Sequence, residues 1–172
     1  MAIENGYDVV IIGGGPAGAS AGIYAARRRL KTIIFEKGLI GGAINTAPLL
    51  ENYPGFKPAP GMEFGSLLKE QLENLHVEIK TEEIKEIERT DKGFIIKDSD
   101  ISIETKTILI ATGSKYKKLN IPGEEEFLGK GVAFCATCDA PLFINKTVAV
   151  VGGGDNAFRS AQVLAEGCKK FI

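Results

Sequence analysis

Short apolar runs alternate with an amphipathic segment at the start of the chain. Residues 7–12 (YDVVII) and 32–35 (TIIF) are continuous apolar runs, which are typical of buried parallel strands. Between them, residues 16–29 are rich in alanine, carry Pro16 in the first turn and end in three arginines, a pattern that predicts a helix. Strand, helix and strand in this order predict a βαβ unit.

The middle of the chain predicts a long loop, a helix and several short strands. The loop spans 38–61 and holds four prolines, and loops of this length in compact domains usually carry function. Apolar residues at helical spacing predict a helix over 61–75. Alternating segments predict an antiparallel meander with turns at 91–93 and 98–100, and its strands are expected at 77–80, 84–88, 94–97 and 101–105. A separate apolar strand is expected at 107–111.

The last third begins with a polar segment and then repeats the opening pattern. Residues 114–131 carry Pro122 and three glycines, which favours a linker between two domains, 1–115 and 116–172. The pattern then predicts a strand at 147–151, a helix at 156–166 and the start of another strand at 171–172. Because residues 148–154 echo residues 9–15, the chain is expected to hold two dinucleotide-binding units, the second cut short.

Composition and charge exclude several classes of partner. The chain has 21 Lys+Arg and 22 Asp+Glu, a formal net charge of −1, so it lacks the broad positive charge that attracts nucleic acid or anionic lipid. No apolar stretch approaches the ~20 residues that a membrane span needs. The N-terminus carries Glu4 and Asp8 and lacks the basic start of a signal peptide. We therefore expect a cytoplasmic protein with no nucleic-acid or membrane partner.

The first glycine motif, Gly13-x-Gly15-x-x-Gly18, follows a strand and opens a helix. In a dinucleotide-binding turn the first glycine permits the tight turn, the second admits a pyrophosphate, and the third lets the helix pack on the strand. The helix N-terminus adds N–H donors and a favourable field for an anion. Glu36, at the end of the next strand, is placed to accept hydrogen bonds from ribose hydroxyls and favours NAD or FAD over NADP in this site. The alternative is a glycine-rich turn without a ligand.

The second glycine motif, Gly152-x-Gly154-x-x-Ala157, is the weaker form, with alanine in third place. Asp155 and Asn156 lie inside it. It predicts a second nucleotide site, and the alternative is again a purely structural turn.

The pair Cys135-x-x-Cys138, followed by Asp139, carries the reaction hypothesis. Cysteines at this spacing can form a small reversible disulfide, and such pairs often contain one thiol of lowered pKa. Asp139 is a candidate proton donor or acceptor for the leaving thiolate. The alternatives are a zinc half-site, two unconnected buried thiols and an intermolecular disulfide. Zinc would need four ligands, and only Cys168 and His76 remain.

Other polar clusters have plainer interpretations. Cys168 is expected to be a packing thiol, and His76 a solvated imidazole. The acidic run 124–126 and the basic run 115–118 are expected to be solvated loops.

Taken together, these residues make the chain resemble the N-terminal part of a low-molecular-weight thioredoxin reductase, an FAD-dependent pyridine nucleotide-disulfide oxidoreductase. The resemblance runs from about residue 7 to residue 172. The shared motifs lie at 13–18, 36–37, 41–46, 51–55, 111–113, 135–139 and 152–155. A cysteine pair between two glycine motifs is specific to this family among flavin disulfide reductases. The implied fold class is α/β, a Rossmann-like FAD/NAD(P)-binding fold with a parallel sheet, an antiparallel meander and a truncated second dinucleotide-binding unit.

The resemblance also implies cofactors, roles and partners. FAD would occupy the first site, with its pyrophosphate at Gly15 to Gly18 and its ribose at Glu36, and NADPH would bind at the second glycine motif. Cys138 would face the flavin, Cys135 would attack the disulfide of thioredoxin or a thioredoxin-like protein, and Asp139 would donate the proton. A homodimer is implied too. The further cofactor-binding residues implied are Gly13, Pro16, Ala17, Lys37, Gly41, Gly42, Thr46, Asn52, Ala111, Thr112, Gly113, Gly152, Gly154, Asp155, Asn156 and Ala157.

The chain departs from the family pattern in three respects. Ala43 stands where glutamine is usual, and residues 158–160 (FRS) replace a common acidic pair. The family also continues beyond the point that corresponds to residue 172, so we expect the 172 residues alone to be inactive. Two alternatives stay open: a related flavin disulfide reductase with a donor other than NADPH, and an inactive dinucleotide-binding fragment.

Overall fold

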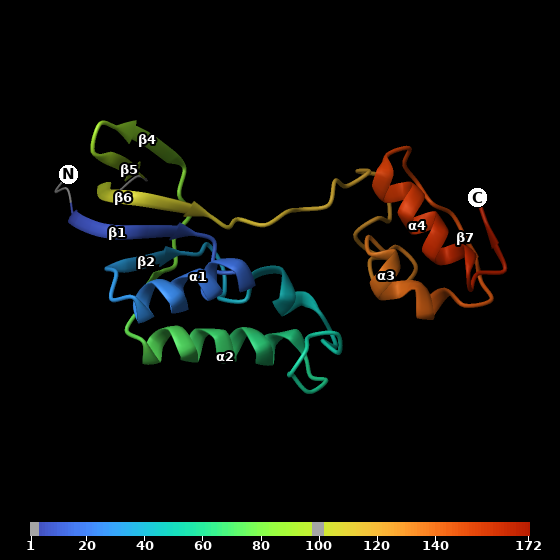
Figure 1. Ribbon diagram of the computed structural model, residues 1–172. Coiled ribbons are helices and arrows are strands. Elements are labelled where there is room, and N and C mark those ends of the chain that lie inside the picture. Colours follow the sequence, from blue (N-terminus) through green and yellow to red (C-terminus); the bar gives the residue numbers. More distant parts are fainter. Residues whose placement is uncertain (1–3, 98–101) are drawn as a thin grey trace. The chain divides into compact units, whose positions relative to one another are not determined.

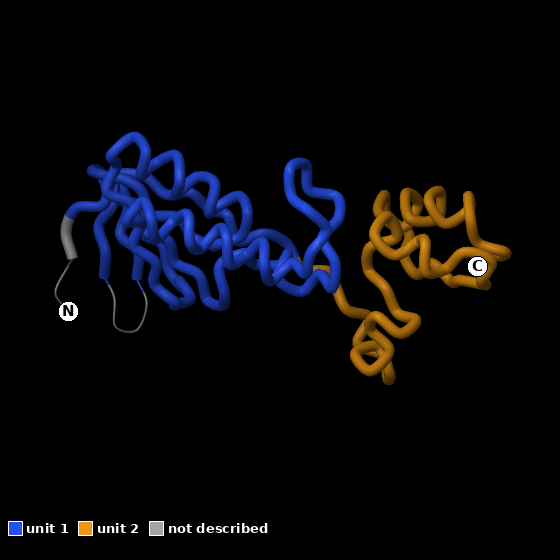
Figure 2. Tube along the Cα trace, turned by 90° about the horizontal axis from the view of Figure 1, so that it is seen from below, with its two compact units in different colours: residues 1–114 blue, residues 115–172 orange. Residues whose placement is uncertain are grey.

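A computed structural model describes residues 4–97 and 102–172. The chain divides into two compact units, residues 1–114 and 115–172, coloured separately in Figure 2. The elements of the first unit are β1 (Glu4–Ile12), α1 (Pro16–Arg27), β2 (Thr32–Phe35), the 3-10 helix η1 (Gly42–Thr46), α2 (Gly61–Asn74), β3 (Glu78–Lys80), β4 (Glu86–Thr90), β5 (Gly93–Lys97) and β6 (Ser102–Ile110).

The first unit is built on one mixed sheet with the strand order β3-β2-β1-β6-β5-β4. Strand β1 pairs in parallel with both β2 and β6, and β3 pairs in parallel with β2. Strands β6, β5 and β4 are antiparallel neighbours. Parallel strands joined by helices, with an antiparallel extension, confirm the predicted α/β, Rossmann-like class.

Both faces of the central strands are buried, which explains why their sequences are continuously apolar. On one face Ile11 and Ile34 pack with Leu72 of α2, on the side where Figure 1 shows α1 and α2. On the other face Val10 and Ile33 pack in a cluster with Ile96 of β5. A buried parallel strand needs apolar residues at every position, whereas a strand with one wet face alternates.

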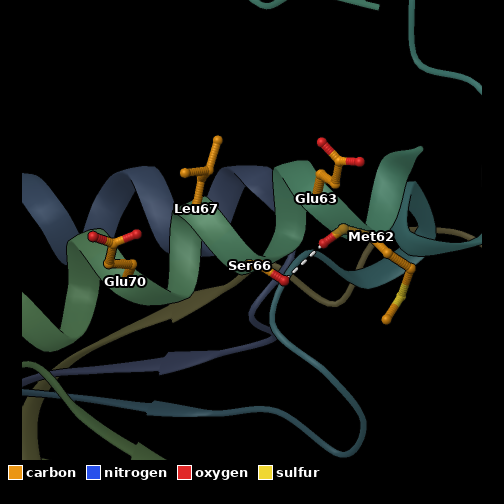
Figure 3. A pocket seen from close by; sticks show the side chains of 5 residues that line it. All are labelled: Met62, Glu63, Ser66, Leu67 and Glu70. Atoms are coloured by element: carbon orange, nitrogen blue, oxygen red, sulfur yellow. Dashed lines mark hydrogen bonds between the residues drawn. The ribbon is translucent and has the colours of Figure 1, made fainter. Parts of the chain in front are cut away.

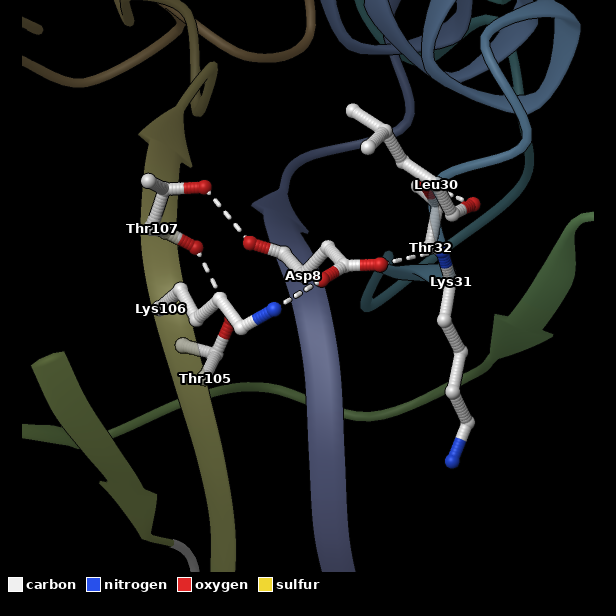
Figure 4. Close-up of polar contacts among 7 residues, drawn as sticks. All are labelled: Asp8, Leu30, Lys31, Thr32, Thr105, Lys106 and Thr107. Carbon is white, nitrogen blue, oxygen red and sulfur yellow. Dashed lines mark hydrogen bonds and ion pairs between the residues drawn. The ribbon is translucent and has the colours of Figure 1, made fainter.

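Asp8 ties the neighbours of β1 together by polar contacts (Figure 4). Its carboxylate accepts hydrogen bonds from the backbone N–H of Lys31 at 2.9 Å and from Lys106 Nζ at 2.7 Å. The hydroxyl of Thr107 donates to the Asp8 carbonyl at 2.7 Å. The hydrogen bond from Lys106, followed by that from Lys31, holds the pKa of Asp8 below its ordinary value of 3.8.

The predicted meander is partly wrong. Residues 78–80 do not join it; they form the opposite edge of the sheet as β3, parallel to β2. The reason is the intervening helix α2, since a strand–helix–strand crossover returns the chain in parallel. The Asp91-Lys92 turn between β4 and β5 is confirmed. The turn predicted at 98–100 lies outside the described residues.

Other element boundaries also differ from the sequence expectation. The strands expected at 101–105 and 107–111 form one continuous strand, β6, because its residues pair with β5 and β1 at once. Strand β4 begins two residues later than the expected segment, and α1 ends at Arg27, before Arg29 adopts a left-handed φ of 61°. The long loop contains η1.

The second unit has short elements. They are α3 (Ala136–Asp139), the 3-10 helix η2 (Ala140–Phe143), β7 (Thr147–Val148), α4 (Asp155–Ala165) and β8 (Lys170–Phe171). The strand expected at 147–151 is only two residues long, because β7 pairs only with the two residues of β8. Within the described part of this unit, Leu164 and Glu124 are the two buried residues.

The acidic run 124–126 is not simply solvated. Glu124 is 5% exposed, and its carboxylate accepts hydrogen bonds from the backbone N–H groups of Leu119 (2.9 Å) and Asn120 (2.7 Å). The expectation of a solvated loop fails here because Asn120 adopts a left-handed φ of 56° and the turn directs two N–H groups at one carboxylate. No described helix has the length and apolar character required to cross a membrane.

Candidate functional site

The turn between β1 and α1 depends on glycine at two positions and leaves open space at a third. Gly13 has a left-handed φ of 104°, and a β-carbon there would lie 2.3 Å from the carbonyl oxygen of Ala111. A β-carbon at Gly18 would lie 1.9 Å from the carbonyl oxygen of Gly13. A β-carbon at Gly15 would meet nothing within 4 Å. The first and third glycines therefore allow close packing, whereas the second faces room for a ligand.

Helix α1 presents an uncapped N-terminus at this space. Gly15 is the N-cap and Pro16 follows, without a side-chain cap and without an acidic residue in the first turn. The first-turn N–H groups, which start at Ala17 because proline has none, lack helical partners and favour an anion. The turn fits the pyrophosphate of a dinucleotide.

Glu36, next after β2, is fixed by two backbone groups. The N–H of Gly14 donates to its Oε2 at 2.6 Å, and the N–H of Gly38 donates to its Oε1 at 2.8 Å. Each carboxylate oxygen can accept a second hydrogen bond. The side chain is thus oriented beside the glycine turn with acceptor capacity left for ribose hydroxyls.

Two further segments meet the glycine turn. The N–H of Gly41 donates to the Gly14 carbonyl at 2.8 Å, and a β-carbon at Gly42 would lie 3.1 Å from Gly15 Cα. The segment after β6 approaches from the other side, since a β-carbon at Gly13 would also lie 3.0 Å from Thr112 Cα. Together with Glu36, these contacts bring three parts of the sequence, residues 13–18, 36–42 and 111–112, to the carboxyl ends of β1, β2 and β6.

The remaining predicted residues of this site lie at its margins. The hydroxyl of Thr46 donates to the Ala43 carbonyl at 2.8 Å, within its own 3-10 turn. Lys37 forms an ion pair with Glu83 at 2.9 Å. Asn52 and Gly113 are exposed, and Gly113 has a left-handed φ of 71°.

In the second unit, Cys135 and Cys138 form a disulfide. Cys135 is the N-cap of α3, where its Sγ accepts a hydrogen bond from the backbone N–H of Cys138 at 3.2 Å. Cys138 is exposed and Cys135 half-buried, so the bond is open to attack by an external thiolate. Asp139 follows directly, with its N–H donating to the Cys135 carbonyl at 3.0 Å.

The second glycine turn joins β7 to α4 and is more exposed than the first. Gly152 has a left-handed φ of 138°, and a β-carbon there would lie 3.2 Å from Ala157 Cβ. Gly154 is the N-cap of α4, and a β-carbon on it would meet nothing within 4 Å. Asp155 and Asn156, the first residues of α4, are exposed.

The sequence profile of the family described as "Pyridine nucleotide-disulphide oxidoreductase" matches residues 7–171. The chain belongs to the pyridine nucleotide-disulphide oxidoreductase family. Among curated relatives, the thioredoxin reductase of Treponema pallidum is 42% identical over 164 residues, which cover 95% of this chain and 53% of that protein. A subunit of the alkyl hydroperoxide reductase of Staphylococcus epidermidis is 44% identical over 162 residues, covering 92% of this chain and 32% of that protein.

Solved structures agree with this assignment. The crystal structure of thioredoxin reductase from Streptococcus pyogenes superposes with a TM-score of 0.86 at 42% identity, covering 96% of this chain and 54% of that one. The similarity to the N-terminal part of thioredoxin reductases is therefore confirmed. The chain spans about half the length of the thioredoxin reductases that it matches.

A glycine turn and a disulfide occur in this one chain, and they lie in different compact units. A groove of about 360 Å³ lies on the outer face of α2 (Figure 3), and no residue predicted for either site lines it. No group of three metal-ligating side chains occurs within the part of the chain that is described.

Sequence reasoning missed three residues that shape the first site. They are Gly61 and Gly65 of α2 and Asn45 of η1, which contact the segment that contains Gly41 and Gly42. The i, i+4 spacing of the two glycines, which puts them on one face of the helix, was the available signal.

Proposed function

We propose that this chain forms the FAD-binding and disulfide-carrying part of a thioredoxin-disulfide reductase that takes electrons from NADPH. The observation that carries the proposal is the Cys135–Cys138 disulfide, exposed at Cys138, in one chain with a dinucleotide-type turn whose Gly15 faces open space. Overall, NADPH and one proton would reduce one protein disulfide to two thiols.

The first turn is proposed as the FAD site. Gly13, Gly15 and Gly18 form the close turn and the open space, and Glu36 offers acceptors for the ribose. FAD, when bound, would supply a two-electron carrier between the nicotinamide and the disulfide. The turn from Gly152 to Ala157 is proposed as the NADPH site. Because Arg159 stands where an acidic residue is usual in the family, NADH and a reduced ferredoxin are the alternative electron donors.

The cysteines are proposed to act in sequence. In the reduced pair, the Cys135 thiolate attacks the partner disulfide and forms a mixed disulfide, while Asp139 protonates the departing partner thiolate. The Cys138 thiol then gives up its proton and attacks Cys135 Sγ as the thiolate. This restores the internal disulfide and releases the second partner sulfur as a thiolate, which takes up that proton. The order of attack follows the family resemblance, and the N–H of Cys138 directed at Cys135 Sγ supports it, because such a donor stabilises a thiolate.

The partner is proposed to be thioredoxin or a thioredoxin-like protein. The relatives named as a thioredoxin reductase and as a subunit of alkyl hydroperoxide reductase are similar to the chain at nearly equal identity, 42% and 44%. We also propose a homodimer in the cytoplasm, as the resemblance implies. Residues 1–172 alone are proposed not to complete the cycle, since the second glycine turn is largely exposed and its sheet has two strands of two residues.

A single-turnover exchange assay tests the disulfide chemistry without any cofactor. The chain is reduced, freed of reductant and mixed with oxidised thioredoxin, and thioredoxin thiols are counted. Cys138→Ser should accumulate a mixed disulfide through Cys135, whereas Cys135→Ser should form none. Cys168→Ser is the matched control, because Cys168 is half-buried with its Sγ donating to the Phe143 carbonyl.

Wild-type chain that leaves thioredoxin oxidised, or a Cys135→Ser variant that still forms the mixed disulfide, would contradict the proposal. Titration with FAD, followed by flavin absorbance, tests the first site separately. Assays with NADPH, NADH and reduced ferredoxin side by side compare the donors, and multiple turnovers by the 172 residues alone would refute their proposed inactivity.

A further inference from the structure

The segment from Leu39 to Thr46 lies between helix α2 and the first glycine turn. On the turn side, Gly41 donates its N–H to the Gly14 carbonyl at 2.8 Å, and Gly42 lies against Gly15. Gly41 and Gly42 both have left-handed φ values, 108° and 57°. Two consecutive glycines can adopt many other backbone conformations, so contacts with the rest of the structure are needed to fix this one.

On the helix side, two glycines of α2 let the segment approach its backbone. A β-carbon at Gly61 would lie 1.8 Å from the Ile44 carbonyl oxygen. A β-carbon at Gly65 would lie 2.1 Å from Asn45 Oδ1 and 2.8 Å from the Ile40 carbonyl oxygen. Because neither glycine has a side chain, the segment lies directly against the backbone of α2.

Asn45 is the side chain that joins the two sides. Its Nδ2 donates to the Ile40 carbonyl at 3.0 Å and to the Leu39 carbonyl at 3.4 Å, the two carbonyls that precede Gly41. Its Oδ1 lies close to both Gly41 and Gly65, where a β-carbon would be 2.4 Å and 2.1 Å from it. Ile40 is buried, so its carbonyl would have limited access to water if the amide were removed.

We propose that Asn45 is a positioning residue that holds the Gly41–Gly42 turn against Gly14 and Gly15 and thereby shapes one wall of the proposed FAD site. The part that concerns FAD rests on the proposed function. Asn45 acts through the backbone of residues 39–42, and no contact of its own with the cofactor is required.

Hydrogen exchange of the ligand-free chain tests the positioning role directly. Loss of the two side-chain hydrogen bonds in Asn45→Ala should raise the exchange rate of the Gly41 N–H about tenfold, while core amides such as Ile11 and Ile34 keep their rates. Asn45→Asp keeps the size of the side chain but replaces its donors with an acceptor, so it should match Asn45→Ala. Asn74→Ala, at the exposed end of α2, is the matched control and should leave the Gly41 rate unchanged.

FAD titration of the same proteins tests the consequence. Asn45→Ala and Asn45→Asp should raise the FAD dissociation constant about tenfold, and Asn74→Ala should not. A Gly41 N–H that exchanges equally fast in wild type and Asn45→Ala would overturn the positioning role, as would a wild-type rate in Asn45→Asp. A wild-type chain that binds no FAD would instead overturn the proposed cofactor site and the role assigned to Asn45 in shaping it.

Discussion

Glu36 joins two segments of the proposed dinucleotide site through one carboxylate. It accepts from Gly14 in the first glycine turn and from Gly38 at the start of the long loop. The position of an acid after β2 could be predicted from the sequence. Its two backbone partners could not, because they depend on how the turn and the loop fold around it. The same residue therefore connects the turn to the loop and has acceptor capacity left for the ribose of the proposed site.

The variant Glu36→Gln tests the hydrogen bonds of the carboxylate separately from the space that the side chain fills. The amide keeps the size of the side chain but directs an NH₂ group at one of two N–H donors, so we expect the ADP dissociation constant to rise about tenfold or more. Isothermal titration with ADP measures this. Glu70→Gln, on the exposed face of α2, is the control and should bind ADP as the wild type does.

Asp8 predicts a pH dependence of stability. Its pKa is lowered in the folded chain by Lys106 and Lys31, so the ionised carboxylate favours folding. This contribution is present above the unfolded pKa and is lost as pH falls through the lower, folded pKa. Asp8→Asn should therefore reduce the free energy of unfolding at neutral pH, and the difference from wild type should shrink as the pH falls below 3.8.

Urea unfolding from pH 7 down to about pH 3 measures the Asp8 effect. Asp91→Asn, in the exposed turn between β4 and β5, serves as the matched control. A stability difference between wild type and Asp8→Asn that stays constant over this range would show that the charge of Asp8 does not stabilise the fold.

At the scale of elements, the β1–α1–β2 unit could be predicted because its signals are local. The apolar run, the glycine turn and the alanine-rich helix each lie within a few residues. Strands β3 and β6 could not be predicted correctly, because their direction and length depend on partners distant in sequence. The sequence of residues 78–80 predicts one more meander strand, but the crossover through α2 places them in parallel beside β2.

The glycines of the β1–α1 turn should respond to alanine in opposite ways. Gly13→Ala places a β-carbon 2.3 Å from the Ala111 carbonyl oxygen at a left-handed φ, so it should cost roughly 2–4 kcal/mol of stability. Gly15→Ala meets nothing within 4 Å and should fold with near wild-type stability, yet its methyl group would occupy the open space. We expect it to weaken ADP binding about tenfold or more.

Thermal unfolding and ADP titration of the two variants, run in parallel, test this contrast. Equal stability of Gly13→Ala and Gly15→Ala would mean that the turn is not packed as described. A Gly15→Ala chain that binds ADP as tightly as wild type would remove the open space at Gly15 from the candidate site.

At the scale of the whole molecule, the family could be predicted from the sequence, but the distribution of buried residues could not. The two glycine motifs and the cysteine pair can be recognised in the sequence because each has a fixed spacing. Glu124 is buried while most of its neighbours are exposed, and this could not be predicted. Three consecutive glutamates do not indicate which of them a turn will enclose.

The two units should differ in resistance to proteolysis. Residues 112–120 are exposed throughout and contain Lys115, Lys117 and Lys118, three sites for trypsin. The first unit holds two buried apolar clusters, whereas Leu164 is the one buried apolar residue in the described part of the second. Because local unfolding is easier where few apolar contacts are buried, trypsin should cut this segment first, leave the first unit intact and then degrade the second.

Mass spectrometry of a limited digest, with the disulfide kept oxidised, identifies the order of cuts. Lys115→Gln, Lys117→Gln and Lys118→Gln combined should slow the first cut and leave the thermal midpoint nearly unchanged. All three side chains are exposed, and an exposed ion pair such as Lys118–Glu125 contributes little to stability. Early cleavage after Arg27 or Arg28, at the end of α1, would place the weakest region inside the first unit. In that case the packing of α1 against β2, rather than the segment between the units, would limit the stability of the proposed FAD site.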